Sequence, residues 1–470
     1  MNGLWRAVLI MSLGLAGCAG LPPKPTPVVL PAEAPLSDIA GGGGSWPTTE
    51  WWKQYEDPTL DRLIEMALRY SPTLVTAHAR FESARQSVRI ASTATGAHLQ
   101  ANGDLSRQRL SDNGLFPPQL LGFTWYNQMD LGLQATYTFD WWGKQREAVE
   151  AAMDEAHASQ ADRSAAALML ASSIADTYFG WQSDQSRLAL AREREITVQR
   201  EAAITAARIG AELDSSDESQ RAAAALAAVR EQIAALEGSA NLRVVALAAL
   251  VGRAAAELPP MAPKPMPPVG GAVPDDVRID LIARRADVTA SRWRVEAAER
   301  SRDSARAEFF PDVSINALIG IQSIDVSTLL EYGSRVPSAG AAVHLPLFDA
   351  GRLKARYGAS QVAVDSAVAL YQDTVVNAAR DVATQASTLA QISAQRTQRA
   401  IELDAALKLK ISAAARVHQG ITDSRAELSA DDAWIEQRDA LLQLDAAAVS
   451  ADIGLKRALG GGYERAMATP

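Results

Sequence analysis

The sequence predicts an α+β membrane protein in which several copies share one β-barrel and each copy continues into long helices. Three observations support this fold class. The two halves of the chain repeat each other, and four segments alternate apolar and polar side chains over about ten residues. Four long stretches lack proline and favour helix. The chain thus combines the strand pattern of an outer-membrane barrel with helices far longer than those of a compact globule.

Composition excludes several classes of function. The net charge of −9, from 46 basic and 55 acidic residues among 470, leaves no basic surface that would hold nucleic acid by counterion release. A single cysteine excludes a disulfide framework and a thiolate metal cluster. The five histidines form no pair at helical i, i+4 spacing, and no nucleophile has a base at motif spacing. We therefore expect no metal, no cofactor, no nucleic-acid partner and no enzymatic activity.

The N-terminus predicts export. Residues 1–17 carry Arg6 and then about ten apolar residues, too few to span a bilayer, so they are a signal peptide. The run from Leu15 to Cys18 resembles a bacterial lipobox, in which the cysteine is acylated, for example with palmitate. By the same resemblance, Ala19 in place of aspartate favours sorting to the outer membrane. The alternative is an ordinary cleaved signal with an incidental cysteine. Residues 18–50 are rich in proline and glycine and predict a tether.

The rest of the chain contains two repeats. Phe139–Lys144 is echoed by Phe348–Arg352 about 208 residues later, and Arg208–Gly210 is echoed within Arg416–Gly420. A looser match sets Leu74–Ala84 against Val288–Ala298. Three echoes in the same order favour duplication over chance. We assign repeat 1 to 51–258, a proline-rich connector to 259–274, repeat 2 to 275–460 and a C-terminal tail to 461–470.

Alternating side chains predict two strands in each repeat. Alternate residues from Leu131 to Phe139 are apolar, and the residues between them are small or polar. Val313 to Gln322 shows nearly the same pattern, which recurs more weakly in 99–105 and 339–347. Outer-membrane strands alternate in this way, and so do half-buried strands of a soluble sandwich. The strands are placed near 97–107, 128–140, 311–322 and 338–348.

The predicted helices decide between these alternatives. The stretch from Lys144 to Arg208 has no proline, and at about 1.5 Å per residue it would form a rod of about 100 Å. Helices this long imply coiled-coil packing. Their high alanine content allows close packing, although alanine also simply favours helix. The four predicted helices are 144–208, 214–250, 352–419 and 423–459.

Four strands cannot close a barrel by themselves. Open sheet edges are not tolerated in hydrocarbon, because unpaired backbone groups find no water there. If these strands span a membrane, several chains must therefore share one barrel. A shared barrel continued by a shared cylinder of helices forms a conduit.

Several segments resemble the TolC-like outer-membrane efflux proteins, in particular the lipoprotein (NodT-type) branch, which provides exit ducts for resistance-nodulation-division pumps. Trp51–Leu63 has the paired tryptophans, Asp-Pro and leucines of that branch. Pro346–Arg352 matches the passage from strand to helix. Arg284–Val288 matches an Arg-Arg-Pro-Asp segment, except that Ala286 replaces the proline. The order of these motifs, together with the lipobox and the repeat, makes the resemblance specific.

This resemblance implies a homotrimer with a twelve-stranded barrel in the outer membrane, anchored to outer-membrane lipid, and a helical coiled-coil barrel in the periplasm. It implies two further partners, a periplasmic adaptor (membrane fusion) protein and an inner-membrane pump, which pass drugs, metals or other solutes out of the cell. The exit duct of a type I protein-secretion system shares this architecture. A lipid-anchored periplasmic coiled-coil scaffold without a pore is the alternative from another class.

The resemblance also places candidate docking residues. The family's adaptor docks on the periplasmic tips of the helix pairs, which fall here on Arg208, Gly210, Arg416 and Gly420. Both glycines suit a turn between antiparallel helices, since glycine adopts left-handed backbone angles without penalty. The alternative is that these tips are ordinary exposed helix caps, with aspartates as N-terminal caps.

Other candidate residues concern the channel itself. Some family members carry two aspartates after the second tip, and these positions fall here on Ala426 and Ser429. Asp423, Glu427 and Asp431 would supply a periplasmic gate from a shifted register, or else form a solvated helix face.

The strands supply the last candidates. On their polar face, Asp130, Asp140 and His344 are expected to face the lumen. Trp141 and Trp142 suit an interfacial aromatic belt, or packing inside the trimer.

Overall fold

The computed structural model describes residues 22–31, 33–35, 42–113 and 117–464. The predicted signal peptide 1–17 and Cys18 lie outside these residues, as do parts of the predicted tether and tail. The chain forms two compact units. The described residues of Met1–Val29, Phe81–Ala158 and Arg292–Leu370 form the first unit, and those of Leu30–Arg80, Ser159–Ser291 and Tyr371–Pro470 form the second.

The long helices occur where the sequence predicts them, with ends that differ by at most two residues. Helices α5 and α9 each have 67 residues, which corresponds to about 100 Å at 1.5 Å per residue. Helices α3, α5, α8 and α9 contribute residues to both units. The helices are α2 (Pro58–Tyr70), α3 (Pro72–Thr93), α4 (Pro118–Leu121), α5 (Lys144–Gly210), α6 (Ser216–Val251), α7 (Val277–Arg284), α8 (Ala286–Ala307), α9 (Arg352–His418) and α10 (Ser424–Ala458).

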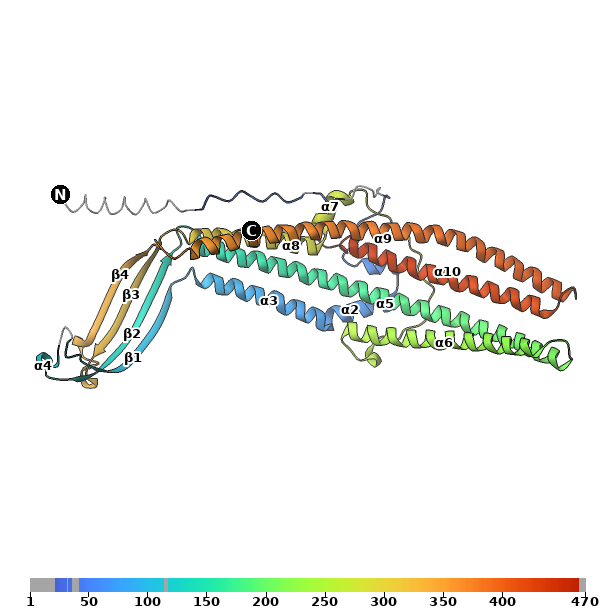
Figure 1. Ribbon diagram of the computed structural model, residues 1–470, viewed down its shortest axis with the longest axis horizontal. Coiled ribbons are helices and arrows are strands. Elements are labelled where there is room, and N and C mark those ends of the chain that lie inside the picture. Colours follow the sequence, from blue (N-terminus) through green and yellow to red (C-terminus); the bar gives the residue numbers. More distant parts are fainter. Residues whose placement is uncertain (1–21, 32, 36–41, 114–116, 465–470) are drawn as a thin grey trace. The chain divides into compact units, whose positions relative to one another are not determined.

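The first unit contains one antiparallel sheet of four strands in the order β1-β2-β3-β4 (Figure 1). The strands are β1 (His98–Arg109), β2 (Trp125–Phe139), β3 (Asp312–Ser323) and β4 (Arg335–His344). Each repeat supplies two of them, as predicted. Strand β4 ends earlier than the predicted residue 348, and Pro346 explains this because proline has no N–H for the ladder.

The strand register sorts the side chains onto two faces. Gln100 pairs with Gln134, Gln134 with Leu318 and Leu318 with Ser338, so the even-numbered residues of all four strands share one face. That face is mainly polar. The opposite face is mainly apolar and its larger side chains are exposed, including Leu99, Leu105, Leu131, Leu133 and Ile319. This is the pattern of a sheet with one wet face and one lipid face.

The second unit has a hydrophobic core where its opening segment meets the long helices. The 3₁₀ segment η2 (Trp51–Tyr55) buries three aromatic rings, and Tyr55 packs edge-on against Phe179 with 5.0 Å between ring centroids. Helix α2 adds Leu60, Leu63 and Ile64, none of which is exposed. Sections of α5, α6 and α10 complete this cluster.

Arg285 stabilises the start of α8. The helix begins at Ala286, where the resemblance would place a proline. The Arg285 guanidinium donates two hydrogen bonds to the Asp287 carboxylate, at 3.0 and 2.6 Å, and one to the Ala458 carbonyl at 2.9 Å. These contacts fix the start of the helix without the proline ring.

One helix among the described residues, α6, is long and apolar enough by length and composition to cross a membrane. Alanine, leucine and valine together give the helix this apolar character. Helix α6 nevertheless pairs through charged groups with α5: Arg230 with Glu195, Glu237 with Arg192, and Arg243 with Asp184. These pairs identify α6 as one arm of a helical hairpin.

Candidate functional site

The polar face of the sheet carries two of the predicted lumen residues. Asp130 of β2 accepts a hydrogen bond from Gln128 at 2.9 Å and lies directly opposite Asp104 of β1. His344 is the last residue of β4 and is exposed, opposite Asp312. Asp104 was not among the candidates from the sequence. The alternation that begins at Leu99 puts it on the polar face, but its partner follows only from the register.

Asp140 does not belong to this face. Strand β2 ends at Phe139, and the Asp140 carboxylate accepts the backbone N–H groups of Gln145 at 3.1 Å and Arg146 at 2.7 Å. A carboxylate in this position satisfies donors that the first turn of a helix leaves unpaired. The prediction of Asp140 as a lumen-facing strand residue is therefore wrong, because it caps the start of α5.

The tip between α5 and α6 turns at a different residue from the predicted one. Gly210 is the last residue of α5, and Glu212 adopts the left-handed conformation with φ of 61°. The N–H of Leu213 donates to the Arg208 carbonyl at 2.9 Å, and that of Glu212 to the Ile209 carbonyl at 2.9 Å. This is the Schellman ending of a helix. The prediction of Gly210 as the turn glycine is wrong.

The tip between α9 and α10 has the same geometry with the expected residue. Gly420 has φ of 71°. The N–H of Ile421 donates to the Arg416 carbonyl at 2.9 Å, and that of Gly420 to the Val417 carbonyl at 3.0 Å. Gly420 thus occupies the position equivalent to Glu212, and the duplication extends to the hydrogen bonds of the turn.

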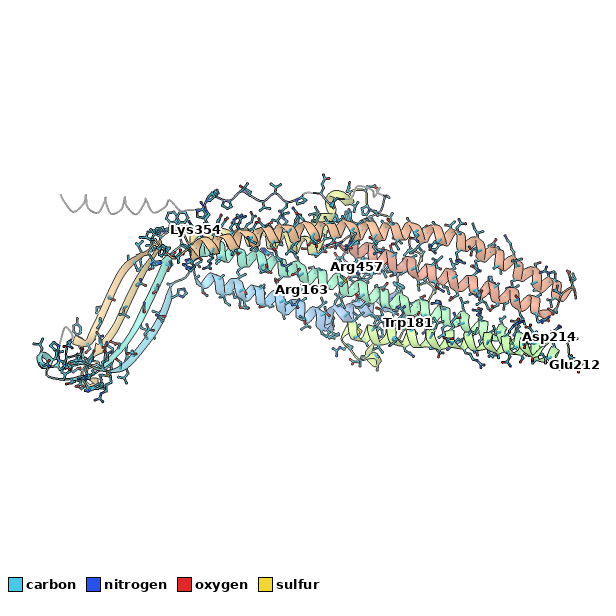
Figure 2. The ribbon with its side chains drawn as sticks, viewed as in Figure 1. Arg163, Trp181, Glu212, Asp214, Lys354 and Arg457 are labelled. Atoms are coloured by element: carbon cyan, nitrogen blue, oxygen red, sulfur yellow. The ribbon has the colours of Figure 1, made fainter. Side chains whose placement is uncertain are left out.

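The two tip arginines have different surroundings. Arg208 forms two hydrogen bonds with Asp214, at 2.8 and 3.1 Å, and Arg425 of α10 reaches the same carboxylate at 3.4 Å. The Arg208 guanidinium lowers the pKa of the Asp214 carboxyl. Figure 2 labels Glu212 and Asp214 at this tip. Arg416 is exposed, and its side chain has no hydrogen bond or ion pair with any described residue. Of the two tip arginines, Arg416 is therefore the one whose side chain is available to bind a partner.

The three candidate gate acids also differ. Asp423 caps α10 by accepting the Arg425 N–H at 3.1 Å, and the Arg425 side chain lowers the pKa of its carboxyl. Asp431 is bound by Lys410 of α9 and accepts the Thr197 hydroxyl of α5 at 2.8 Å. Glu427 is half-buried and pairs with no described residue. Of the three, only Glu427 has no partner among the described residues.

Charged contacts that the sequence did not reveal join α10 to α5. The Arg194 guanidinium binds Asp432 at 2.7 and 3.0 Å and Glu436 at 2.6 Å, and Arg187 binds Asp439 at 2.7 and 3.2 Å. Such two-pronged contacts are among the stronger hydrogen bonds. The partners are more than 230 positions apart in sequence, so no local pattern indicates them.

Two buried networks fix the opening segment of the second unit. Asp57 caps α2 and accepts hydrogen bonds from the Tyr178 hydroxyl and from Lys264 Nζ, both at 2.8 Å. Burial alone would raise the pKa of the Asp57 carboxyl. The hydrogen bonds outweigh this effect and hold the pKa below its usual value. Asp57 therefore connects α5 to the proline-rich connector.

The second network joins the opening segment to α10. Asp452 is buried, accepts the Tyr55 hydroxyl at 2.6 Å and binds Lys456. Burial raises the pKa of the Tyr55 phenol, and the Asp452 carboxylate raises it further. Burial lowers the pKa of Lys456, which Asp452 opposes. The Asp452 carboxylate thus stabilises the charged form of the Lys456 ammonium group.

Comparison of the sequence with known proteins identifies relatives over nearly its whole length. A family described as "Outer membrane efflux protein" matches residues 63–253 and 278–461. The chain is 32% identical over 475 residues to the "Multidrug resistance outer membrane protein MdtP" of Escherichia coli K12, covering 98% of this chain and 97% of that protein. It is 31% identical over 478 residues to MdtQ of Escherichia coli O157:H7, covering 96% and 97%.

Solved structures agree with these relatives. The outer membrane protein VceC from Vibrio cholerae has a TM-score of 0.80 at 30% identity, covering 89% of this chain and 100% of VceC. The outer-membrane channel OprN has a TM-score of 0.84 at 24% identity and shares the fold, covering 95% and 99%. The sheet with one polar face, the paired long helices and these matches lead to one conclusion. The chain belongs to the outer membrane efflux protein family and is an outer-membrane exit duct for efflux.

Proposed function

We propose that this chain forms a homotrimeric exit duct through which a multidrug efflux system expels small molecules. The names of the relatives support drugs as the substrates, since MdtP and MdtQ are both called multidrug resistance proteins. The duct moves solutes without covalent chemistry. An inner-membrane pump supplies the energy, and a periplasmic adaptor joins the pump to the duct.

The sheet supports assembly with further copies. It is an open row of four antiparallel strands whose outer edges are β1 and β4. Because every neighbouring pair is antiparallel, β4 of one copy runs in the correct direction to pair with β1 of the next. Three copies would close a twelve-stranded barrel and leave no unpaired edge in the hydrocarbon.

The helices of the second unit form a matching row. Charged pairs connect them in the order α6, α5, α10 and α9 (Figure 1). The outermost helices carry exposed apolar side chains, Leu242 and Val245 on α6 and Ile401, Leu409 and Ile411 on α9. Neighbouring copies would cover these side chains and close the row into a tunnel. The proposal rests on this observation: the four strands form an open row, and so do the four long helices α6, α5, α10 and α9.

The tips support adaptor docking. Leu213 and Ile421 occupy equivalent positions just after the turns, and each is 64% exposed. An adaptor would cover these apolar side chains, and the unpaired Arg416 would bind an acceptor on it. Within the chain, Arg208 supports the first tip through Asp214 and so shapes the docking surface without contacting the adaptor.

The remaining site assignments are part of the same proposal. Cys18 carries the lipid that anchors the mature chain to the outer membrane, and Asp130 and His344 face the barrel lumen. Glu427 is the candidate gate acid because no other residue in the described part of the chain binds its carboxylate. Asp423 and Asp431 are bound within the chain and act on the gate through the helix contacts they make.

Purified mature protein provides the test. We expect a trimer by light scattering after detergent extraction, single-channel conductance in planar bilayers, and an acylated N-terminal Cys18 peptide by mass spectrometry. The variant Leu242→Glu places a charge on the exposed face of α6 and should yield monomers. The matched variant Leu68→Glu changes an exposed leucine of α2 and should leave the trimer intact. A wild-type monomer that is soluble without detergent would refute the proposal.

A further inference from the structure

A cavity of about 580 Å³ in the first unit has no part in the proposed conduction path. It lies between residues 24–27 of the tether, the start of α5 and one face of α8. Four basic and four acidic side chains line it, so its charges balance. Trp142 and Phe310 form its aromatic wall, with stacked rings at 4.6 Å between centroids. Such a cavity suits a ligand that carries both signs of charge.

Arg302 is the strongest indication of a ligand. Its side chain is only 5% exposed, and it lines the cavity. A guanidinium has five N–H donors. Among the described residues, this one donates a single hydrogen bond, from Nε to Asp303 at 3.2 Å, while Glu299 lies 3.7 Å from a terminal nitrogen. The remaining donors of this guanidinium have no acceptor within hydrogen-bond distance in the described chain, and a ligand in the cavity would provide one.

Basic side chains of the tether and of α8 line the cavity together. Along α8 the charged lining residues are, in order, Glu296, Glu299, Arg300, Arg302, Asp303 and Arg306. Arg306 donates to the Pro22 carbonyl at 3.3 Å and, like Lys24, pairs with no carboxylate of the described chain. Arginine suits a phosphate because its planar donors match phosphate oxygens. Glu299, beside Arg302, would accept an ammonium group of the same ligand.

The position of the cavity indicates that the ligand is a lipid. Trp141 and Trp142 follow the end of β2, and Leu347 and Phe348 follow the end of β4; Trp141, Leu347 and Phe348 are 65%, 80% and 91% exposed. Exposed aromatic and apolar side chains at strand ends mark the boundary of a membrane. Pro22 follows Cys18 by four residues, which span at most about 14 Å of extended chain. The cavity therefore lies within reach of the proposed lipid anchor, a step that rests on the proposed function.

We propose that this cavity binds the headgroup of a zwitterionic phospholipid of the ethanolamine class. Arg302, Arg306 and Lys24 bind the phosphate, Glu299 binds the ammonium group, and the stacked pair Trp142 and Phe310 contacts the upper part of the acyl chains. An anionic lipid such as phosphatidylglycerol has no group for the acidic side. The bound lipid would join the tether to α8 and thereby fix the duct at the membrane surface.

Calorimetric titration of the purified trimer tests this assignment. The ligands are short-chain phosphatidylethanolamine, short-chain phosphatidylglycerol and O-phosphoethanolamine, which is the same headgroup without acyl chains. We expect phosphatidylethanolamine to bind more tightly than either of the others. Equal binding of phosphatidylglycerol would overturn the zwitterionic assignment, and equal binding of O-phosphoethanolamine would overturn the lipid.

Variants locate the binding in the cavity. The double variant Lys24→Gln/Arg306→Gln should weaken phosphatidylethanolamine binding about tenfold or more, since it removes two charge-assisted contacts. Lys354→Gln/Arg352→Gln removes two exposed cations near the start of α9, where Figure 2 labels Lys354, and should leave the affinity unchanged. Glu299→Gln should weaken phosphatidylethanolamine binding and leave phosphatidylglycerol binding as it was. An unchanged affinity in the Lys24→Gln/Arg306→Gln variant would refute the site.

Trimer content and single-channel conductance are measured on the same samples. Intact trimers that conduct but bind no phosphatidylethanolamine would refute the lipid site alone. Wild-type protein that neither forms trimers nor conducts would refute the proposed function instead.

Discussion

The two helical hairpins, α5/α6 and α9/α10, share one design but make different contacts. Their long arms have equal length, and both turns are closed by the same pair of backbone hydrogen bonds. In the described part of the chain, the ion pairs of α6 with other helices are all with α5, whereas α10 forms them with both α5 and α9. The acidic residues of α10 thus join the two hairpins, whereas α6 carries the exposed apolar side chains Leu242 and Val245.

Substitutions of the buried carboxylates Asp452 and Asp57 should have the largest effects on stability. Asp452→Asn on α10 should lower the free energy of unfolding by about 3 kcal/mol, because it leaves the mostly buried Lys456 ammonium without its counter-ion. Asp57→Asn on the α5 side should cost less, because the Lys264 side chain is 40% exposed and can be solvated. Denaturant unfolding of the detergent-solubilised protein, followed by circular dichroism, measures both. A larger loss for Asp57→Asn would contradict the ranking.

Ion pairs on the two sides of α5 give a second, smaller contrast. Arg194→Gln removes a two-pronged contact to α10 between side chains that are each 26% exposed, and should cost about 1–2 kcal/mol. Arg192→Gln removes a contact to α6 between side chains that are 60% and 48% exposed, and should cost at most about 0.5 kcal/mol. A double-mutant cycle of Arg194→Gln with Asp432→Asn isolates the pair. Equal losses for the two arginine variants would mean that α10 is bound no more tightly than α6.

Local patterns in the sequence predicted the elements of this fold, but long-range contacts determined the details of the sites. Alternation placed the four strands, and the absence of proline placed the helices. The roles of Asp140 and Gly210 were wrong because helix caps and turns depend on the residue at which each element ends, and a shift of two residues changes the role of a side chain. The pairing of Arg194 with Asp432 links positions 238 apart, and only the packed hairpins reveal it.

The start of the long arms gives a third contrast, which depends on pH. Asp154 of α5 is buried, whereas Val362, the equivalent residue of α9, is exposed. Burial raises the pKa of the Asp154 carboxyl to about 6, and the nearby Glu296 carboxylate adds to the shift, while Arg300 opposes it. Because the folded state binds this proton more tightly than the unfolded state, the stabilisation is complete below about pH 4 and is lost as the pH rises through about 6.

The variant Asp154→Asn tests this dependence. It should raise the free energy of unfolding by about 1 kcal/mol at pH 7, allowing for water that reaches the site, and change it little at pH 4. Thermal unfolding at the two pH values measures the difference. Val362→Asn at the equivalent exposed position is the control and should show no dependence on pH. A stabilisation that is larger at pH 4 than at pH 7 would refute the assigned direction of the pKa shift.

The tips give the smallest contrast. Gly420→Ala places a side chain at φ of 71°, where Cβ is disfavoured but no neighbouring atom lies within 4 Å of it, so we expect a loss of about 1 kcal/mol. Glu212 already bears this strain at φ of 61°. Glu212→Gly should therefore stabilise the protein by about 0.5 kcal/mol, since the relief of strain exceeds the added freedom of the unfolded chain. Thermal unfolding of both variants measures these opposite signs. If Glu212→Gly proved destabilising, the Glu212 side chain would have to make a contact in the trimer, and the first tip would then be part of the interface between copies.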